Sequence, residues 1–274
     1  MTVPSTPGAA LPPLTPRAWL RWDVVSRLLD GPGGPQTATV LEIGCGQGSM
    51  GARLARRGRY LGVEPDAASG AVAEARVTAA GGRVISGDHT AVPAGSTYDL
   101  VCAFEVLEHI KDDAAVLADW VGFVRPGGRL LLSVPAFADR YGPTDEQIGH
   151  YRRYEPDELG ARLGEAGLVD ARVIVYGWPL GHLLEAVRNR IDRRRLAAAG
   201  HLSLEERTAA SGRTFQPPNA KVGLAVQVAT TPFRHLQRLA PNRGTGLVAI
   251  ATRPEGSPGD LDRECADRSS GEQQ

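Results

Sequence analysis

The sequence predicts an α/β domain built on a doubly wound, mostly parallel sheet of seven strands. Seven apolar runs of strand length recur along the 274 residues, and helical patterns separate most of them. A parallel connection needs a crossover long enough to hold a helix, so this alternation favours parallel pairing. The composition agrees, because 42% hydrophobic and 23% charged residues are typical of a globular protein with a packed core.

The first predicted helix begins at Pro16 and ends at Asp30, with Thr15 as its N-cap and proline at the first helical position. Residues 1–14 are rich in proline, alanine, serine and threonine, so we expect a flexible arm. Residues 255–274 are polar and are predicted to form a disordered tail. The predicted domain therefore spans residues 15–254.

The remaining elements follow in order along the chain. The predicted strands are Thr39–Ile43, Tyr60–Val63, Arg83–Ser86, Leu100–Phe104, Leu130–Val134, Ala171–Tyr176 and Leu247–Thr252. The predicted helices between them are Met50–Arg57, Ala67–Ala79, Asp113–Val124 and Pro156–Ala166. Residues 177–245 interrupt the alternation of strands and helices before the last strand. Apolar residues at helical spacing in Leu180–Leu196 and Leu224–Leu239 predict a helical cap there, inserted between the last two strands.

Charge and cysteine content exclude several classes of protein. The 31 basic residues balance the 31 acidic ones, so the net charge gives no indication of nucleic acid as a partner. Three cysteines far apart favour a reducing compartment over a disulfide framework. The sequence shows neither a signal-peptide pattern nor an apolar run of membrane-spanning length. We therefore expect a cytoplasmic protein without a membrane partner, and its oligomeric state is left open.

A glycine-rich loop follows the first predicted strand, as in nucleotide-binding α/β folds. The glycines are Gly44, Gly46 and Gly48, a G-x-G-x-G spacing that differs from the G-x-G-x-x-G of dinucleotide sites. Glu42 precedes them by two residues. A carboxylate there is unfavourable for pyrophosphate but suits a ligand with positive charge and amine donors. The pattern therefore favours S-adenosylmethionine over a nicotinamide cofactor.

Acidic residues also follow the second and third predicted strands. Glu64 comes twenty residues after Gly44, where a strand-end carboxylate can accept both ribose hydroxyl protons. Asp88 follows the third strand and is placed to accept from an adenine amine. All these acids would lie at the carboxyl edge of the sheet, where open α/β folds bind ligands.

Four motifs in this order resemble the class I S-adenosylmethionine-dependent methyltransferases of Rossmann-like fold. They are Val40–Gly48, Gly62–Asp66, Asp99–Val101 with Glu105–His109, and Val124–Leu130. The resemblance is to small-molecule enzymes and implies that the methionine, ribose and adenine portions contact nine residues: Glu42, Gly44, Cys45, Gly46, Gly48, Glu64, Asp88, His89 and Glu105.

Glu105, Glu108 and His109 are spaced i, i+3 and i+4, which places them on one face if the segment is helical. Similar E-x-x-E-H segments accompany a divalent metal in some small-RNA and quinone-biosynthesis methyltransferases. Two carboxylates and an imidazole are suitable ligands. The segment is also common in metal-free relatives, so we predict no metal here.

A polar segment, Asp145–Tyr154, follows the fifth predicted strand, where a loop would cover the acceptor. Its G-H-x-R-R-Y stretch resembles one in many bacterial methyltransferases. An imidazole ordinarily titrates near neutral pH, so His150 is our candidate general base, with His109 as the other catalytic candidate. Alternatively, His150 and Arg153 tie the loop to the sheet edge.

The predicted function is methyl transfer from S-adenosylmethionine to a small organic acceptor at oxygen, nitrogen or activated carbon. Two alternatives remain open: a metal-assisted RNA 2′-O-methyltransferase, and a protein that binds S-adenosylmethionine without methylating anything. A nicotinamide-dependent reductase is disfavoured by the glycine spacing and by Glu42.

Overall fold

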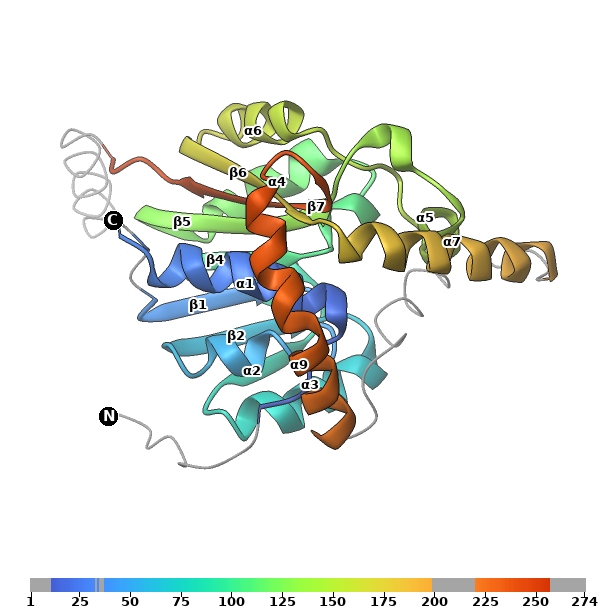
Figure 1. Cartoon of the computed structure of the whole chain (residues 1–274). Coiled ribbons are helices and arrows are strands. Elements are labelled where there is room, and N and C mark those ends of the chain that lie inside the picture. Colours follow the sequence, from blue (N-terminus) through green and yellow to red (C-terminus); the bar gives the residue numbers. More distant parts are fainter. Residues whose placement is uncertain (1–10, 33, 35–36, 199–219, 257–274) are drawn as a thin grey trace, which may run out of the picture.

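The computed structural model describes residues 11–32, 34, 37–198 and 220–256, and they form a three-layer α/β fold (Figure 1). The central sheet has seven strands in the order β3-β2-β1-β4-β5-β7-β6. These strands are β1 Thr39–Ile43, β2 Arg59–Glu64, β3 Arg83–Ser86, β4 Tyr98–Phe104, β5 Val124–Pro135, β6 Val169–Gly177 and β7 Gly244–Thr252. Strands β1 to β5 pair in parallel, whereas β7 is antiparallel to both β5 and β6. The predicted fold class is confirmed.

Helices cover both faces of the sheet, because neighbouring residues of a strand point to opposite faces. On β4, Leu100 and Cys102 pack in one core with helix α1 (Pro16–Asp30). Val101 and Ala103 point the other way, into a core with α4 (Asp113–Gly122) and α6 (Pro156–Glu165). The remaining helices are α2 Gly51–Leu54, α3 Ala67–Thr78, α5 Pro143–Ile148, α7 Leu180–Ala198 and α9 Ala220–Leu236.

The N-terminal boundary of the domain lies earlier than predicted. Thr15 caps α1 as expected, its Oγ1 accepting from the Ala18 N–H at 3.2 Å. Leu14, assigned to the flexible arm, is only 2% exposed. The Arg53 guanidinium donates to the Pro12 carbonyl at 2.9 Å. Burial of Leu14 and this hydrogen bond attach residues 11–14 to the domain; the rest of the predicted arm lies outside the described residues.

The described part of the insertion between β6 and β7 contains the two predicted helices, but they pack on different surfaces. Helix α7 leaves the end of β6, while α9 crosses the face of the sheet over α1 (Figure 1). Arg238, just after α9, donates to Asp23 of α1 at 2.5 Å, and Gln237 donates to the same carboxylate at 3.1 Å. Only α7 reaches the cavity described below. Among the described residues, the cap over that cavity is therefore one helix, not two.

The two ends of this insertion meet. Gly177, the last residue of β6, pairs with Gly244, the first residue of β7. Residues 199–219 of the predicted cap, and the predicted tail from residue 257 onward, lie outside the described residues. Within the described ranges, none of the helices combines the length and the apolar character needed to cross a bilayer. Cys45 and Cys102 are buried free thiols.

Candidate functional site

A cavity of about 1370 Å³ opens at the carboxyl ends of β1, β2 and β4. One end is lined by the glycine loop and by the acidic residues that follow β2 and β3. The other end is lined by the segment after β4, the polar segment before α6, and α7. The cavity thus joins six of the nine predicted cofactor residues to both predicted catalytic histidines. Its walls include apolar side chains from every side: Ile43, Phe104, Val106, Ile110, Val116, Trp120, Ile148, Leu184, Val187 and Ile191.

The three glycines of the loop have different structural roles, although all have positive φ. A Cβ on Gly44 would lie 2.6 Å from Cγ2 of Val106, and one on Gly48 would lie 2.9 Å from Cα of Ala73. These two glycines allow close packing of the loop. A Cβ on Gly46 would meet no heavy atom within 4 Å, and Gly46 lines the cavity. Gly46 therefore leaves open space where a ligand can approach the backbone.

Glu64 stands at the end of β2 and connects this strand to the glycine loop. Its Oε2 accepts from the Gly46 N–H at 2.7 Å, and its Oε1 accepts from the Asp66 N–H at 3.0 Å. Burial raises the pKa of Glu64, while these two backbone donors act in the opposite direction. Each carboxylate oxygen keeps a second lone pair for a ligand hydroxyl, and Glu64 lines the cavity as predicted.

Asp88 and His89, which follow β3, also line the cavity. The Oδ1 of Asp88 accepts from the Thr90 hydroxyl at 2.6 Å and from the Thr90 N–H at 2.9 Å. The hydroxyl, aided by the backbone donor, lowers the pKa of Asp88, so this carboxylate stays ionised at neutral pH. His89 lies with Nε2 3.3 Å from Oδ2 of Asp119. Both residues are placed at the predicted adenine end.

Three residues predicted to contact the cofactor do not line the cavity: Glu42, Cys45 and Gly48. Glu42 is 2% exposed, and its Oε2 accepts from the Tyr60 hydroxyl at 2.6 Å. Burial raises the pKa of Glu42 to about 8. The Cys45 thiol is also buried, and burial raises its pKa. The side chains of Glu42 and Cys45 thus lie beneath the glycine loop, away from the cavity, and Gly48 packs against α3.

The cofactor end fits S-adenosylmethionine on three structural grounds. Gly46 leaves room for a ligand against the backbone. Glu64 offers a carboxylate at the end of β2 for the ribose hydroxyls, and Asp88 offers a second acceptor one strand further. Carboxylates that accept hydrogen bonds at these positions suit a ligand with hydroxyl and amine donors.

Glu105, at the end of β4, lies between two arginines of α1. Its Oε2 is 3.2 Å from Nη2 of Arg17, and its Oε1 is 3.2 Å from Nη1 of Arg21. The Ser133 hydroxyl donates to it at 3.0 Å. Burial alone would raise the pKa of Glu105, but the two arginines outweigh it and lower this pKa. Glu105 also has a φ of 59°, a strained conformation for a residue with a side chain.

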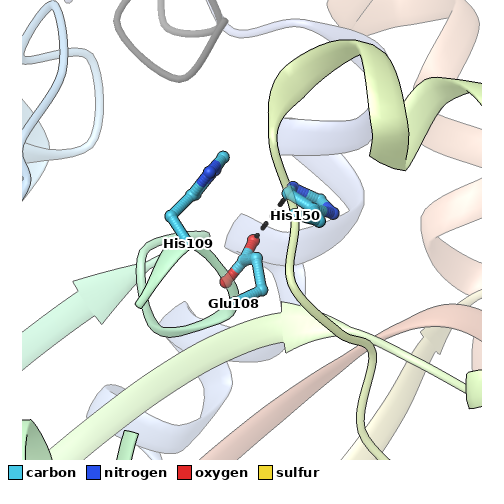
Figure 2. Close-up of side chains that lie close together, drawn as sticks. All are labelled: Glu108, His109 and His150. Carbon is cyan, nitrogen blue, oxygen red and sulfur yellow. Dashed lines mark ion pairs between the residues drawn. The ribbon is translucent and has the colours of Figure 1, made fainter. Parts of the chain in front are cut away.

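His150, His109 and Glu108 form a cluster at the acceptor end (Figure 2). Their candidate ligand atoms all lie within 4.8 Å of one another. The two imidazole rings meet edge to face with centroids 4.6 Å apart. Nε2 of His150 is 3.6 Å from Oε1 of Glu108. Folding therefore brings His150 to two residues of the E-x-x-E-H segment, more than 40 positions earlier.

Glu108 is completely buried, and neither of its carboxyl oxygens has a hydrogen-bond partner among the described residues. Burial and the charge of Glu105 raise the pKa of Glu108 well above its ordinary value. Two arrangements would satisfy these oxygens: a protonated carboxyl, or a divalent cation among Glu108, His109 and His150. The sequence predicts no metal, and treatment with a chelator separates these two arrangements.

The polar segment before α6 holds His150 rigidly. Nδ1 of His150 is 2.8 Å from Oδ1 of Asp145, whose carboxylate also receives Arg153 through Nε at 3.0 Å and Nη2 at 2.7 Å. All three side chains are at most 4% exposed. His150 nevertheless lines the cavity. The two interpretations of this segment are therefore compatible, because the contacts that tie the loop also orient the ring.

Helix α1 and much of α7 contribute residues to the cavity that the sequence did not predict. Arg17 and Arg21 line the cavity, although the apolar spacing of α1 indicated only docking on the sheet. Glu185 and Arg188 of α7 line it as well. The signal available in the sequence was two arginines four positions apart, Arg17 and Arg21, which share one helical face.

The fold and the cavity together define an α/β domain built to bind S-adenosylmethionine at the carboxyl edge of its sheet. Residues 16–173 match the family model described as a methyltransferase domain. This match covers more than half of the 274 residues, so the chain belongs to the methyltransferase domain family.

Relatives in sequence and structure carry the same class of name. The chain is 35% identical over 122 residues to an uncharacterized methyltransferase of Mycobacterium sp. (strain JLS), covering 43% of this chain and 46% of that protein. It is 32% identical over 170 residues to a ubiquinone biosynthesis O-methyltransferase of Methylobacterium sp. (strain 4-46), covering 55% and 68%. The chain thus spans about half to two thirds of the length of these curated relatives.

Among solved structures, the fold matches the N-methyltransferase NodS from Bradyrhizobium japonicum WM9 in complex with S-adenosyl-L-homocysteine. The TM-score is 0.52, the identity is 17%, and 86% of each chain is covered. At this identity the likeness is one of fold alone.

Proposed function

We propose that this protein transfers a methyl group from S-adenosylmethionine to a small organic acceptor, with His150 as the general base. The observation that carries the proposal is the shared cavity. Gly46 and Glu64 line one end of it, and His109 and His150 line the other. When bound, S-adenosylmethionine supplies a methyl group activated by its sulfonium. The protein then has to align the acceptor with this methyl group, which can supply roughly 7–11 kcal/mol at best.

His150 is better placed than His109 to accept a proton. Asp145 holds Nδ1 of His150, so Nε2 is left as the basic atom of the ring. Burial, together with the charge of His150, lowers the pKa of His109 to about 4. His109 is therefore neutral at physiological pH and a weak base. We assign to His109 the role of lining the acceptor site beside His150.

A hydroxyl is the acceptor that this arrangement suits best. A hydroxyl must lose a proton as it is methylated, and the proton would pass from the acceptor oxygen to Nε2 of His150. Relatives named as ubiquinone biosynthesis O-methyltransferases support an oxygen acceptor. We further propose that the chain belongs with the bacterial enzymes that share its G-H-x-R-R-Y segment, that it acts in the cytoplasm, and that nucleic acid is not its acceptor.

The direct test incubates the protein with S-adenosylmethionine and a panel of phenols, catechols and hydroxy acids. We expect S-adenosylhomocysteine to form only with accepted compounds. Binding of S-adenosylmethionine without turnover of any acceptor would instead support the non-methylating alternative. Methylation of short RNA at a 2′-hydroxyl would support the RNA alternative. Calorimetric titration with NADH should show no binding, which would exclude the reductase.

A further inference from the structure

Helix α7 is connected to His150 by an unbroken chain of buried ionic contacts. Oε1 of Glu185, on α7, lies 2.5 Å from Nη1 of Arg153. The same guanidinium contacts Asp145, and Asp145 contacts Nδ1 of His150. The exposed fraction of the side chain is 10% for Glu185, 3% for Arg153, 2% for Asp145 and 4% for His150. Water therefore has little access to any of these links.

Arg153 is the branching point of this chain. Its planar guanidinium donates through Nε and Nη2 to Asp145, and through Nη1 to Glu185. A guanidinium offers its donors in a fixed fork, so its orientation toward one carboxylate depends on the other. Glu185 also pairs with Arg140 through its second oxygen. Glu185 on α7 therefore helps to orient the guanidinium of Arg153.

A second set of contacts holds α7 against the segment that carries Asp145. The Asn189 Oδ1 accepts from the Thr144 N–H at 3.1 Å, and the Asp192 carboxylate accepts from the Thr144 hydroxyl at 3.0 Å. The neighbouring side chains Leu184, Val187 and Ile191 of α7 line the cavity. One helix therefore forms part of the acceptor wall and is also joined to the proposed base.

We infer that Glu185 is a positioning residue, which acts through Arg153 and Asp145 to fix the ring orientation and the tautomer of His150. The inference rests on the proposed function for its catalytic consequence, but the tautomer can be measured without any activity. With Glu185 in place, Arg153 donates to Asp145 through both Nε and Nη2, and Asp145 keeps the ring proton on Nδ1. Replacing Glu185 by glutamine leaves Nη1 of Arg153 with a neutral amide oxygen and the Ala136 carbonyl at 3.4 Å in place of a carboxylate. The weaker hold lets the guanidinium turn, so the Asp145 carboxylate loses its fixed direction.

The test compares Glu185→Gln with the wild type by ¹⁵N NMR of the histidine rings, at a pH where the rings are neutral. We expect the wild-type His150 to show a protonated Nδ1 and an unprotonated Nε2. In Glu185→Gln we expect a mixture of both tautomers. The exposed His235 on α9 is an internal reference whose signals should stay unchanged. Glu165→Gln, at an exposed position of α6, is the matched control variant.

Kinetics provides the second readout. Glu185→Gln should lower kcat about tenfold, with the Kd for S-adenosylmethionine within twofold of the wild-type value. Glu185→Asp, which keeps the charge, should recover part of the lost kcat. An unchanged His150 tautomer in a folded Glu185→Gln variant would overturn the inference. If the tautomer shifts as expected but His150→Ala keeps full turnover, the inference stands and the proposed base is wrong.

Discussion

Asp145 and His150, five residues apart, exchange contacts through both backbone and side chain: the His150 N–H donates to the Asp145 carbonyl at 2.9 Å, and Nδ1 lies 2.8 Å from Oδ1. This double contact closes the loop around the ring and directs Nε2 away from Asp145. A histidine held in this way can serve as a base without having to reorient first.

Replacing His150 tests this role. We expect His150→Ala to lower kcat by roughly 100-fold or more, while the Kd for S-adenosylmethionine stays nearly unchanged. The measurement is turnover of one acceptor together with calorimetry of the cofactor. His235→Ala, on the exposed side of α9, should behave like the wild type. A fall in melting temperature and in acceptor affinity, with kcat preserved, would show that His150 only ties the loop.

The ribose assignment depends on Glu64. Glu64→Ala should weaken S-adenosylmethionine binding by about 1–3 kcal/mol, because ribose hydroxyls would lose a charged acceptor and the Gly46 N–H would lose its partner. Isothermal titration calorimetry measures the effect, and Glu74→Ala at an exposed position of α3 is the control. An affinity equal to that of the wild type would refute the assignment.

Gly46 offers a steric test of the cofactor end. Gly46→Val should abolish binding, since its branched side chain would enter the open space against which the ligand lies. Gly95 is a matched control, because it also has positive φ and no heavy atom within 4 Å of a Cβ, but does not line the cavity. Gly95→Val should therefore lower the melting temperature, because of the strain of positive φ, while the affinity for S-adenosylmethionine is retained. Equal loss of binding in both variants would mean that backbone strain, not occupied space, is responsible.

Chelation addresses the buried Glu108 carboxyl. We expect treatment with EDTA, followed by gel filtration, to leave turnover intact, because a protonated Glu108 needs no cation. Mass spectrometry of metal content in the untreated protein is the control. Loss of turnover that Mg²⁺ or Mn²⁺ restores would instead make Glu108, His109 and His150 metal ligands.

Glu42 makes folding stability depend on pH. Its pKa rises from 4.5 to about 8 on burial, so the folded state holds a proton that the unfolded chain releases. This stabilisation is complete below pH 4.5 and is lost as the pH rises through 8. Glu42→Gln keeps an acceptor for Tyr60 but cannot ionise. In the absence of ligand it should melt at a higher temperature than the wild type at pH 9, with a smaller difference at pH 5. If the difference in melting temperature between Glu42→Gln and the wild type is the same at pH 5 and pH 9, burial does not raise the pKa of Glu42.

Much of the fold could be read from the sequence, because periodic apolar residues reflect burial directly. Each predicted strand is present, and the helix at Pro16 begins and ends as expected. Strand β5 begins six residues earlier than the apolar run at Leu130, since ladder pairing with β4 extends through the polar turn. The short helix α5 has no apolar repeat and went unrecognised.

The site was harder to predict, because its geometry depends on contacts between distant segments. Gly46, Glu64 and Asp88 could be located, since parallel strand ends meet at one edge. Nothing in the local sequence could show that Glu42 would face Tyr60 instead of the cavity. The grouping of Glu108 with His150, and the approach of Glu185 to Arg153, likewise exist only after the chain has folded.

Because Gly177 pairs with Gly244, strands β6 and β7 form in effect a hairpin whose turn has been replaced by residues 178–243. The chain leaves the sheet and returns to it at the same point, so the entropy of closing this excursion changes only slowly with its length. A change in the length of the excursion therefore need not alter the register of β6 and β7. The apolar side chains that α7 presents to the cavity, Leu184, Val187 and Ile191, can therefore vary to change the proposed acceptor preference, provided that Glu185 keeps its contact with Arg153.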